Sequence, residues 1–304
     1  MWFRNLVIYR LPDDWSVSPA DLEAQLARRP LQPCGPLEMS SRGWVTPSPA
    51  GRLVHTVGPH HLIALGVDQK LLPASIIRQV TAERAEELAR EQGYPVGRRQ
   101  MRDLKMRVTE ELRSRALTRR RTTRAWIDAQ AGWLVVDSAG MQRAEELVET
   151  LRDTLGSFAV QPLQTERSPR TSMAAWLAQS GAPPRFTIDQ DLELQAADGS
   201  KATIRYSRYP LDGKEIRTYL SSGLCATRLG LTWNDRISFV LTDKLQIKRV
   251  EFLGMERERS SEGEDIDPVE QFDIDFTLMA GELGGLLSAL SQALGVQSQQ
   301  RAAA

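Results

Sequence analysis

The sequence predicts an α+β fold in which helices and short antiparallel strands mix without a regular β-α-β order. Three observations favour this class. Segments with apolar residues at helical spacing alternate irregularly with short runs that are typical of strands. One pair of such runs is separated by Asp198-Gly199, a sequence typical of a hairpin. The chain has 304 residues, of which 41% are hydrophobic, enough for one large domain or two to three ordinary ones.

Helix signals in the first half of the chain come from capping residues and breakers. Ser18 can cap a helix whose first position is Pro19, and this helix ends before Pro30. A later helix is expected to stop at Gly93, a suitable C-cap that Pro95 follows as a breaker. The elements expected here are strands in residues 3–11, 52–57 and 61–67, and helices in residues 19–29, 74–92 and 99–117.

The second half begins with two short strands around a glycine-containing turn in residues 122–138. Ser138 is expected to cap a helix that ends at Gly156. Residues 162–184 are rich in Pro, Ser and Thr, which indicates a connecting region with one short helix. The other elements expected are a strand in 158–163, a hairpin in 192–209, a helix in 214–222, an antiparallel meander in 226–233, 236–241 and 245–253, and a last helix in 276–294.

These elements suggest four parts. They are an N-terminal α+β part in residues 1–72, a basic helical projection in 73–122, a β-hairpin with a helix and the connecting region in 123–184, and a C-terminal α+β part with the meander and the last helix in 185–304.

Charge is balanced over the whole chain but not along it. The 39 Lys and Arg residues offset the 39 Asp and Glu residues, so the net charge predicts no partner. Between Arg98 and Arg124, however, eleven basic residues accompany only three acidic ones, whereas Glu262 to Asp275 contains seven acids and no Lys or Arg. The distribution of charge is therefore more informative than its sum.

The basic segment has the pattern of a surface that binds a polyanion. Met101, Leu104, Val108 and Leu112 are expected to form the apolar stripe of the helix in 99–117. Arg102, Lys105 and Arg113 fall in a narrow sector beside this stripe, and Arg98 joins them if the helix starts one residue earlier. The candidate nucleic-acid contacts are Arg98, Arg99, Arg102, Lys105, Arg113, Arg115, Arg119, Arg120, Arg121 and Arg124.

Cations on a rigid edge suit the phosphate backbone of a nucleic acid and do not read base sequence. A solvated helix surface is the simpler alternative. Few acidic residues are placed to relieve the repulsion, which favours binding of a polyanion. The pattern does not distinguish DNA from RNA. A protein-binding adaptor whose basic helix docks an acidic partner is a further alternative.

Arg119, Arg120 and Arg121 are consecutive, so they cannot all face one way in a helix or strand. We expect at most two of them to reach a nucleic acid and one to pair with an acid.

The common signatures of catalysis and metal binding are absent from the sequence. It has no HExxH, no CxxC and no phosphate-binding loop motif. The three histidines, His55, His60 and His61, are interpreted as structural or surface residues. Cys34 and Cys225 are expected to be buried thiols. The glycines of residues 281–285 lie inside an apolar helical pattern and indicate close helix packing rather than a phosphate site.

The acids near the C-terminus suggest one enzymatic alternative. Asp265, Asp267, Asp273 and Asp275 could bind Mg²⁺ and make the protein a nuclease. Asp273 and Asp275 alternate with apolar residues, and the upstream acids lie in a segment rich in Ser and Gly, so an exposed acidic loop is the preferred interpretation.

The N-terminus has no pattern of a signal peptide, and no stretch has eighteen uncharged apolar residues. A cytoplasmic protein without a membrane partner is therefore expected.

Four stretches resemble the RdgC family of bacterial recombination-associated proteins, in the same order along essentially the whole chain. They are MWFRNLVIYRL at residues 1–11, PCGPLEMSSRGWV at 33–45, LTWNDRISFVL at 231–241 and FDIDFTLMAGELGGLL at 272–287. The resemblance implies a nucleoid-associated protein that binds double-stranded DNA without sequence preference and restrains the recombinase RecA. Single-stranded DNA is left open as a second partner. It also implies no catalysis and no cofactor.

The resemblance further implies a multi-lobed, elongated or horseshoe-shaped subunit. Two such subunits would close into a ring-shaped homodimer with DNA in a positively charged central hole. Leu117 stands where this family is expected to carry Phe at a junction between subunits. Leu can still pack there, but it has less contact area and no ring to stack.

Overall fold

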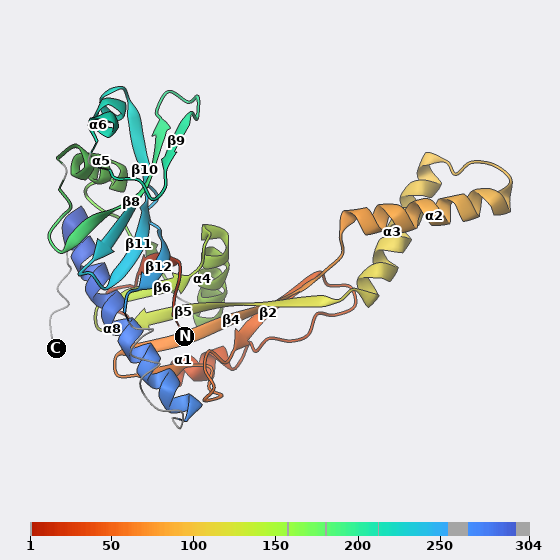
Figure 1. Ribbon diagram of the computed structural model, residues 1–304. Helices are drawn as coiled ribbons and strands as arrows, with labels where there is room; N and C mark the ends of the chain where they lie inside the picture. The colour runs from red at the N-terminus through yellow and green to blue at the C-terminus, as the bar shows by residue number, and fades with distance from the viewer. Residues whose placement is uncertain (1, 157, 180, 212, 255–266, 296–304) are drawn as a thin grey trace. The chain divides into compact units, whose positions relative to one another are not determined.

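The computed structural model describes residues 2–156, 158–179, 181–211, 213–254 and 267–295 (Figure 1). The chain forms two compact units. Unit 1 comprises residues 1–25, 46–63 and 123–304, and unit 2 comprises residues 26–45 and 64–122. Seven helices and a twelve-stranded sheet lie in the described residues, which confirms the α+β class. The division into four parts stays a prediction.

The strands follow the expected order with one addition. Residues 40–45 form a strand that the sequence did not suggest, and the strand that begins at Thr118 starts earlier than expected. The strands are β1 Leu6–Arg10, β2 Ser40–Val45, β3 His55–Val57, β4 His60–Lys70, β5 Thr118–Asp128, β6 Trp133–Asp137, β7 Gln161–Pro162, β8 Phe186–Ala196, β9 Thr203–Tyr206, β10 Leu224–Trp233, β11 Ile237–Thr242 and β12 Ile247–Phe252.

The helices also agree closely with the predicted positions. The helix over Ala74–Gln92 has the expected bounds, and Gly93 ends it in the left-handed conformation with φ 80°. The helices are α1 Pro19–Leu26, α2 Ala74–Gln92, α3 Arg98–Arg115, α4 Met141–Leu155, α5 Pro169–Gln179, α6 Lys214–Ser221 and α8 Pro268–Leu294.

The sheet has the strand order β2-β4-β5-β6-β1-β12-β11-β10-β8-β9, with β3 paired to β4 and β7 paired to β1. The predicted hairpin β8–β9 and the meander β10–β11–β12 are confirmed by their antiparallel pairing. Strands β4 and β5 each run from one unit into the other.

The main core of unit 1 lies between the sheet and α8, which is blue in Figure 1. From α8, Phe276, Met279 and Leu283 are fully buried in this core. A Cβ atom on Gly285 would lie 2.7 Å from Cη2 of Trp233, so only glycine lets this tryptophan pack so closely. The predicted close packing of the glycine-containing helix is therefore confirmed. Arg236 binds Glu282 at 2.9 Å beside this contact, so two of the four quoted stretches meet here.

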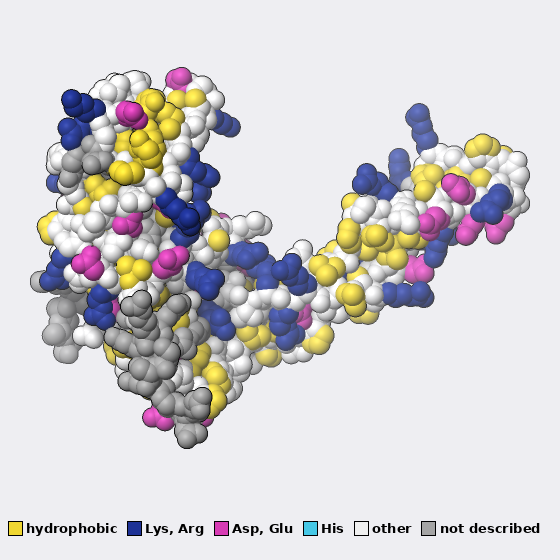
Figure 2. All heavy atoms as spheres, viewed as in Figure 1, with side chains coloured by type: hydrophobic (Ala, Val, Ile, Leu, Met, Phe, Trp, Pro, Cys, Tyr) yellow, Lys and Arg dark blue, Asp and Glu magenta, His cyan; other side chains and the backbone are white. Residues whose placement is uncertain are grey.

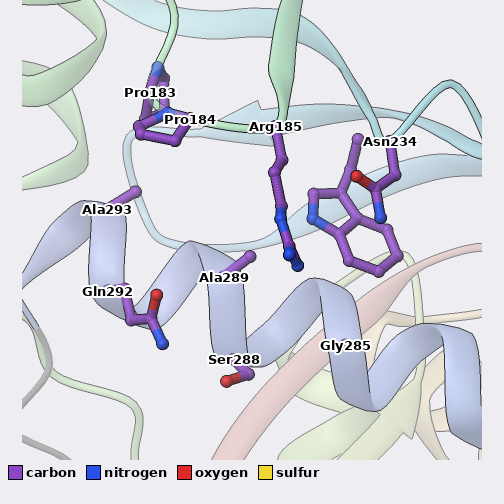
Figure 3. A pocket seen from close by; sticks show the side chains of 10 residues that line it. Pro183, Pro184, Arg185, Asn234, Gly285, Ser288, Ala289, Gln292 and Ala293 are labelled. Carbon is purple, nitrogen blue, oxygen red and sulfur yellow. The ribbon is translucent and has the colours of Figure 1, made fainter.

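A hollow of about 690 Å³ lies beside this contact. Figure 3 shows Arg185 and Asn234 on its strand side, and Ser288, Ala289 and Gln292 on α8.

Two expectations about helix starts are wrong. Helix α8 begins at Pro268 rather than near Phe276, because Asp267 caps it by accepting a hydrogen bond from the backbone N–H of Val269 at 3.3 Å. Helix α4 is preceded by Gly140 instead of Ser138, whose hydroxyl is engaged with the backbone N–H and carbonyl of Gly140.

In unit 2, α2 packs against α3 over a small core of Ala85, Leu104 and Val108. Leu112 is partly buried against this core, but Met101 is 38% exposed, so the prediction that it belongs to the apolar stripe is wrong. The core between α2 and α3 is small and does not extend to Met101.

The other part of unit 2 holds the ends of β2 and β4 together. A Cβ on Gly43 would lie 2.4 Å from the backbone nitrogen of Leu31, so the neighbouring chain segment needs glycine here. The buried Lys70 donates from Nζ to the carbonyl oxygens of Gly35 and Pro36, at 2.7 and 2.9 Å. Residues 33–45 thus fix the end of β4.

Cys34 and Cys225 are free thiols, and they are half-buried rather than buried as expected. Among the helices of the described ranges, none is long and apolar enough to cross a membrane.

Candidate nucleic-acid interface

Helix α3 presents its cations along one sector. Arg98, Arg102, Lys105 and Arg113 form what is called here the basic sector, which adjoins the buried residues Leu104 and Val108. Because α3 starts at Arg98, this arginine is part of the helix, as the sequence analysis allowed. Figure 2 shows dark-blue Lys and Arg side chains along the α2–α3 segment, with apolar side chains between them.

Most cations near the start of α3 are exposed and have no acidic partner in the part of the chain that the structure describes. This group consists of Arg98, Arg99, Arg102 and Lys105. No carboxylate of the described residues competes for these charges, a state that favours release of counterions when a polyanion binds.

The cations at the C-terminal end of α3 differ, because they have partners within the protein. Arg113 is half-buried and donates from Nη1 to the carbonyl oxygen of Leu37 at 3.0 Å, which orients its guanidinium group. The side chain of Arg115 is 78% exposed and lies 3.6 Å from the carboxylate of Glu111, which also binds Arg84 at 2.7 Å. Arg113 is therefore positioned by the protein, and Arg115 is partly neutralised.

Arg119, Arg120 and Arg121 lie on β5, where successive side chains point to opposite faces. Arg120 donates from Nε and Nη2 to the two carboxylate oxygens of Asp68, each at 2.8 Å. The Asp68 side chain is 8% exposed, and its bonds to Arg120 hold its pKa below the ordinary value. One of the three arginines thus pairs with an acid of its own chain, and this acid lies in unit 2.

The acid that receives Arg120 is itself held in place. The backbone carbonyl of Asp68 accepts a hydrogen bond from the Cys34 thiol at 3.2 Å, two residues before the buried Lys70. The bidentate pair therefore connects β5 to the anchored end of β4 and fixes the direction of the strand that carries Arg119.

The remaining candidates are less accessible. Arg121 is half-buried and has an interaction within the protein. Arg124 is also half-buried, and its charge acts on the half-buried carboxylate of Asp137 in unit 1. Of the candidates on β5, Arg119 is exposed without an acidic partner among the described residues.

Leu117 is 78% exposed and belongs to an apolar patch of unit 2. Its carbonyl accepts from the backbone N–H of Leu71 at 2.8 Å, and Leu71 is 51% exposed. Leu37 and Met39 are 70% and 41% exposed. The carbonyl oxygen of Leu37 accepts a hydrogen bond from Arg113, and that of Met39 accepts one from the backbone N–H of Lys70. The four side chains of Leu37, Met39, Leu71 and Leu117 are called the Leu117 patch. Figure 2 shows apolar side chains where α3 and β5 join.

Of the acids of the nuclease alternative, the three that lie in the described residues do not form one site with a further His, Cys, Asp or Glu. Asp273 lies on α8 with Oδ1 3.1 Å from Nε2 of His55, and burial lowers the pKa of this histidine while the charge of Asp273 opposes that change. Asp275 is buried on the same helix and accepts from Gln271 at 3.3 Å. Asp267 caps α8, and Asp265 lies outside the described residues.

Within the described ranges, no group of three or more His, Cys, Asp or Glu side chains is placed to hold a metal ion. The expectation of an exposed acidic loop needs correction after Asp267, because the following acids, Glu270, Asp273 and Asp275, are helical.

Sequence reasoning missed a second group of cations. Arg205, Arg228, Lys248 and Arg249 line one cleft in unit 1, although they come from three different strands. No run of basic residues marks them in the sequence, and only the register of the strands brings them together.

Comparisons with known proteins all point to the same family. The model of the family described as "Putative exonuclease, RdgC" matches residues 1–297. The chain is similar to the recombination-associated protein RdgC of Dechloromonas aromatica, with 48% identity over 301 residues that cover 97% of this chain and 98% of that protein.

Two further relatives agree. The chain is 48% identical to the protein of the same name from Cupriavidus pinatubonensis over 295 residues, covering 97% of this chain and 98% of the relative. It is 43% identical to that of a Janthinobacterium species over 301 residues, covering 99% and 100%.

Proposed function

Because this chain belongs to the RdgC family, we propose that it binds double-stranded DNA through the phosphate backbone, without preference for base sequence and without catalysis. Its relatives carry the name of recombination-associated proteins, which supports a role in DNA recombination.

One observation carries the proposal. Helix α3 presents exposed cations that have no acidic partner among the described residues. Arg98, Arg102 and Lys105 stand on a helix whose adjoining face packs against α2, so their spacing is fixed before DNA arrives. Cations on a fixed edge lose less conformational freedom on binding than cations on a mobile tail. Contacts to phosphates alone give affinity without base specificity.

The protein acts as a homodimer in this proposal, and the Leu117 patch is one of the contacts between subunits. Leu117 and Leu37 are each at least 70% exposed, which is unfavourable for large aliphatic side chains unless another surface covers them. A second copy of the same patch would bury both. The closure of two subunits into a ring with DNA in a central hole is the arrangement that the family resemblance suggests.

The consequence for recombination follows from competition for the same backbone. A protein that covers DNA in the nucleoid without sequence preference limits the DNA that is accessible to RecA. Restraint of RecA therefore needs no base-specific contact and no direct contact with the recombinase.

A gel-shift assay with two unrelated duplexes tests DNA binding. We expect equal affinity for both duplexes, and a large loss in the charge-reversal variant R98E/R102E/K105E. The matched control R78E/R90E/R107E has the same change in charge at exposed positions of α2 and α3 outside the basic sector. Equal losses in both variants would contradict the assignment to the basic sector.

Two further assays test the other parts of the proposal. Leu117→Asp should shift the solution mass toward the monomer, while Ile76→Asp, at an exposed position of α2, should not. Plasmid incubated with the protein and Mg²⁺ should stay intact. Steady cleavage that is lost in Asp273→Asn would replace the proposal with the nuclease.

A further inference from the structure

We propose that the cleft between β8, β9, β10 and β12 in unit 1 is a binding site for a phosphate group, with Arg228 and Lys248 as its principal ligands. The site rests on the proposed function only where the phosphate belongs to DNA. A free phosphate ion is the other source of the same chemistry.

The cleft has a volume of about 270 Å³ and an excess of positive charge. Four cationic side chains and two carboxylates line it, together with the polar residues Asn5, Tyr206 and Ser207. The charged residues of the lining are Arg205, Arg228, Lys248, Arg249, Asp191 and Glu193. Two positive charges therefore remain without an acid in the cleft, which favours an anionic ligand.

Glu193 is already engaged by its neighbours. Arg205 donates to its Oε2 from two nitrogen atoms, and the hydroxyl of Thr227 donates to Oε1 at 3.1 Å. Burial alone would raise the pKa of Glu193, but the bonds from Arg205 and Thr227 hold it below its ordinary value. Glu193 thus stays ionised, and its main partner is Arg205.

Asp191 is engaged in the same way. Its Oδ1 accepts from the hydroxyl of Ser207 at 3.0 Å and from the backbone N–H of Arg208 at 3.3 Å. Its Oδ2 accepts from Nη1 of Arg249 at 3.4 Å. The two acids of the cleft therefore hold Arg205 and Arg249 in position and have little capacity for other donors.

Arg228 and Lys248 are the cations that these acids leave unsatisfied. Nε of Arg228 lies 3.9 Å from Glu193, which is too long for a hydrogen bond, and its side chain is 41% exposed. Lys248 has no acidic partner among the residues that the structure describes. Burial lowers the pKa of Lys248, and the charges of Arg228 and Lys244 lower it further. An anion between Arg228 and Lys248 would relieve this repulsion.

The chemistry of Arg228 and Lys248 fits a phosphate group. A guanidinium group presents parallel N–H donors that match two phosphate oxygens, and an ammonium group acts as a compact point charge beside them. A phosphate oxygen can also accept from the hydroxyl group of Tyr206, since the hydroxyl of Ser207 already donates to Asp191. The strand register fixes the backbone positions of both residues, since Arg228 pairs with Thr242 and Lys248 with Val240.

The test uses the full chain and the variants Arg228→Gln and Lys248→Gln. Lys214→Gln, at an exposed position of α6 outside the cleft, is the control with the same loss of charge. Inorganic phosphate is titrated and followed by its ³¹P resonance, and random duplex DNA is titrated at several salt concentrations. Circular dichroism melting confirms that each variant is folded.

We expect a saturable shift of the phosphate resonance with the wild type and the control, and its loss in both cleft variants. If the occupant is a DNA phosphate, the slope of log affinity against log salt falls by about one in each cleft variant. Loss of the resonance shift with an unchanged slope assigns the site to free phosphate. The proposal is overturned if the cleft variants match the control in both measurements. A wild type that binds phosphate but no DNA would refute the proposed function and leave this site standing.

Discussion

The cations of α3 and those of the cleft in unit 1 differ in whether carboxylates stand beside them. On α3, Arg98, Arg102 and Lys105 are exposed, with no acid bound to them in the described parts of the chain. In the cleft, Asp191 and Glu193 hold two of the four cations. Arg205 and Arg249, the two held cations, are themselves 63% and 68% exposed, so the neighbouring carboxylates and not burial distinguish them from the cations of α3.

The difference has a consequence for binding. An anion that meets α3 displaces only solvent and counterions, whereas an anion that enters the cleft meets cations that are already oriented. The first arrangement suits many weak and exchangeable contacts, and the second suits one defined contact.

The largest expected effect is that of salt on DNA affinity. If the unpaired cations provide six to ten phosphate contacts, affinity should fall by about 10³–10⁵ between 50 and 200 mM salt. The measurement is a titration of one duplex at several salt concentrations. A flat response would show that the exposed cations of α3 do not determine binding.

The two cores should respond differently to truncation. Leu283→Ala, in the core of unit 1, should lower the free energy of unfolding by about 2–5 kcal/mol, because it leaves a cavity under α8. Leu104→Ala should mainly open the α2–α3 contact, since that core is small and lies near solvent. Hydrogen exchange can measure both. Equal loss of protection across the whole chain in both variants would contradict two separate cores.

Neighbouring arginines on β5 should have different roles. Arg120→Gln breaks the pair with Asp68 and should lower the melting temperature, whereas Arg119→Gln should lower DNA affinity with little effect on melting. The pKa of Asp68 is depressed in the folded protein, so the stabilisation is present above its unfolded pKa and is lost as the pH falls through the folded value.

The difference in melting temperature between wild type and Arg120→Gln should therefore be constant near neutral pH and shrink below about pH 4, the ordinary range of a carboxyl pKa. Thermal melts from pH 3 to 8 measure it. A difference that grows in acid would contradict the role of Asp68, and Arg119→Gln is the control.

Much of the fold was predictable because local signals agree with it. Gly93 ends α2, and Asp198-Gly199 lies in the turn between β8 and β9, as expected from their conformational preferences. Strand β2 was missed because its residues Ser40 to Gly43 have weak strand preference, and pairing with β4 makes them a strand. The start of α8 was missed because its first turns carry acids that resemble a loop.

The candidate interface was predictable only where charges are consecutive in sequence. The excess on α3 and β5 was visible, and strand alternation indicated that one arginine of the three would differ. The sequence could not show that Asp68 receives Arg120, because this contact depends on the register of distant strands. For the same reason, Arg228 and Lys248 gave no signal.

The central claim is that one sector of α3 binds the DNA backbone, and the pair Lys105→Glu and Arg107→Glu tests it most directly. Both residues are exposed cations of the same helix, two positions apart, so they face different directions and undergo the same change in charge. The measurement is the affinity for random duplex DNA at several salt concentrations. We predict that Lys105→Glu weakens binding and lowers the salt slope by about one, while Arg107→Glu changes the slope little. Equal effects of the two variants would contradict a defined binding sector.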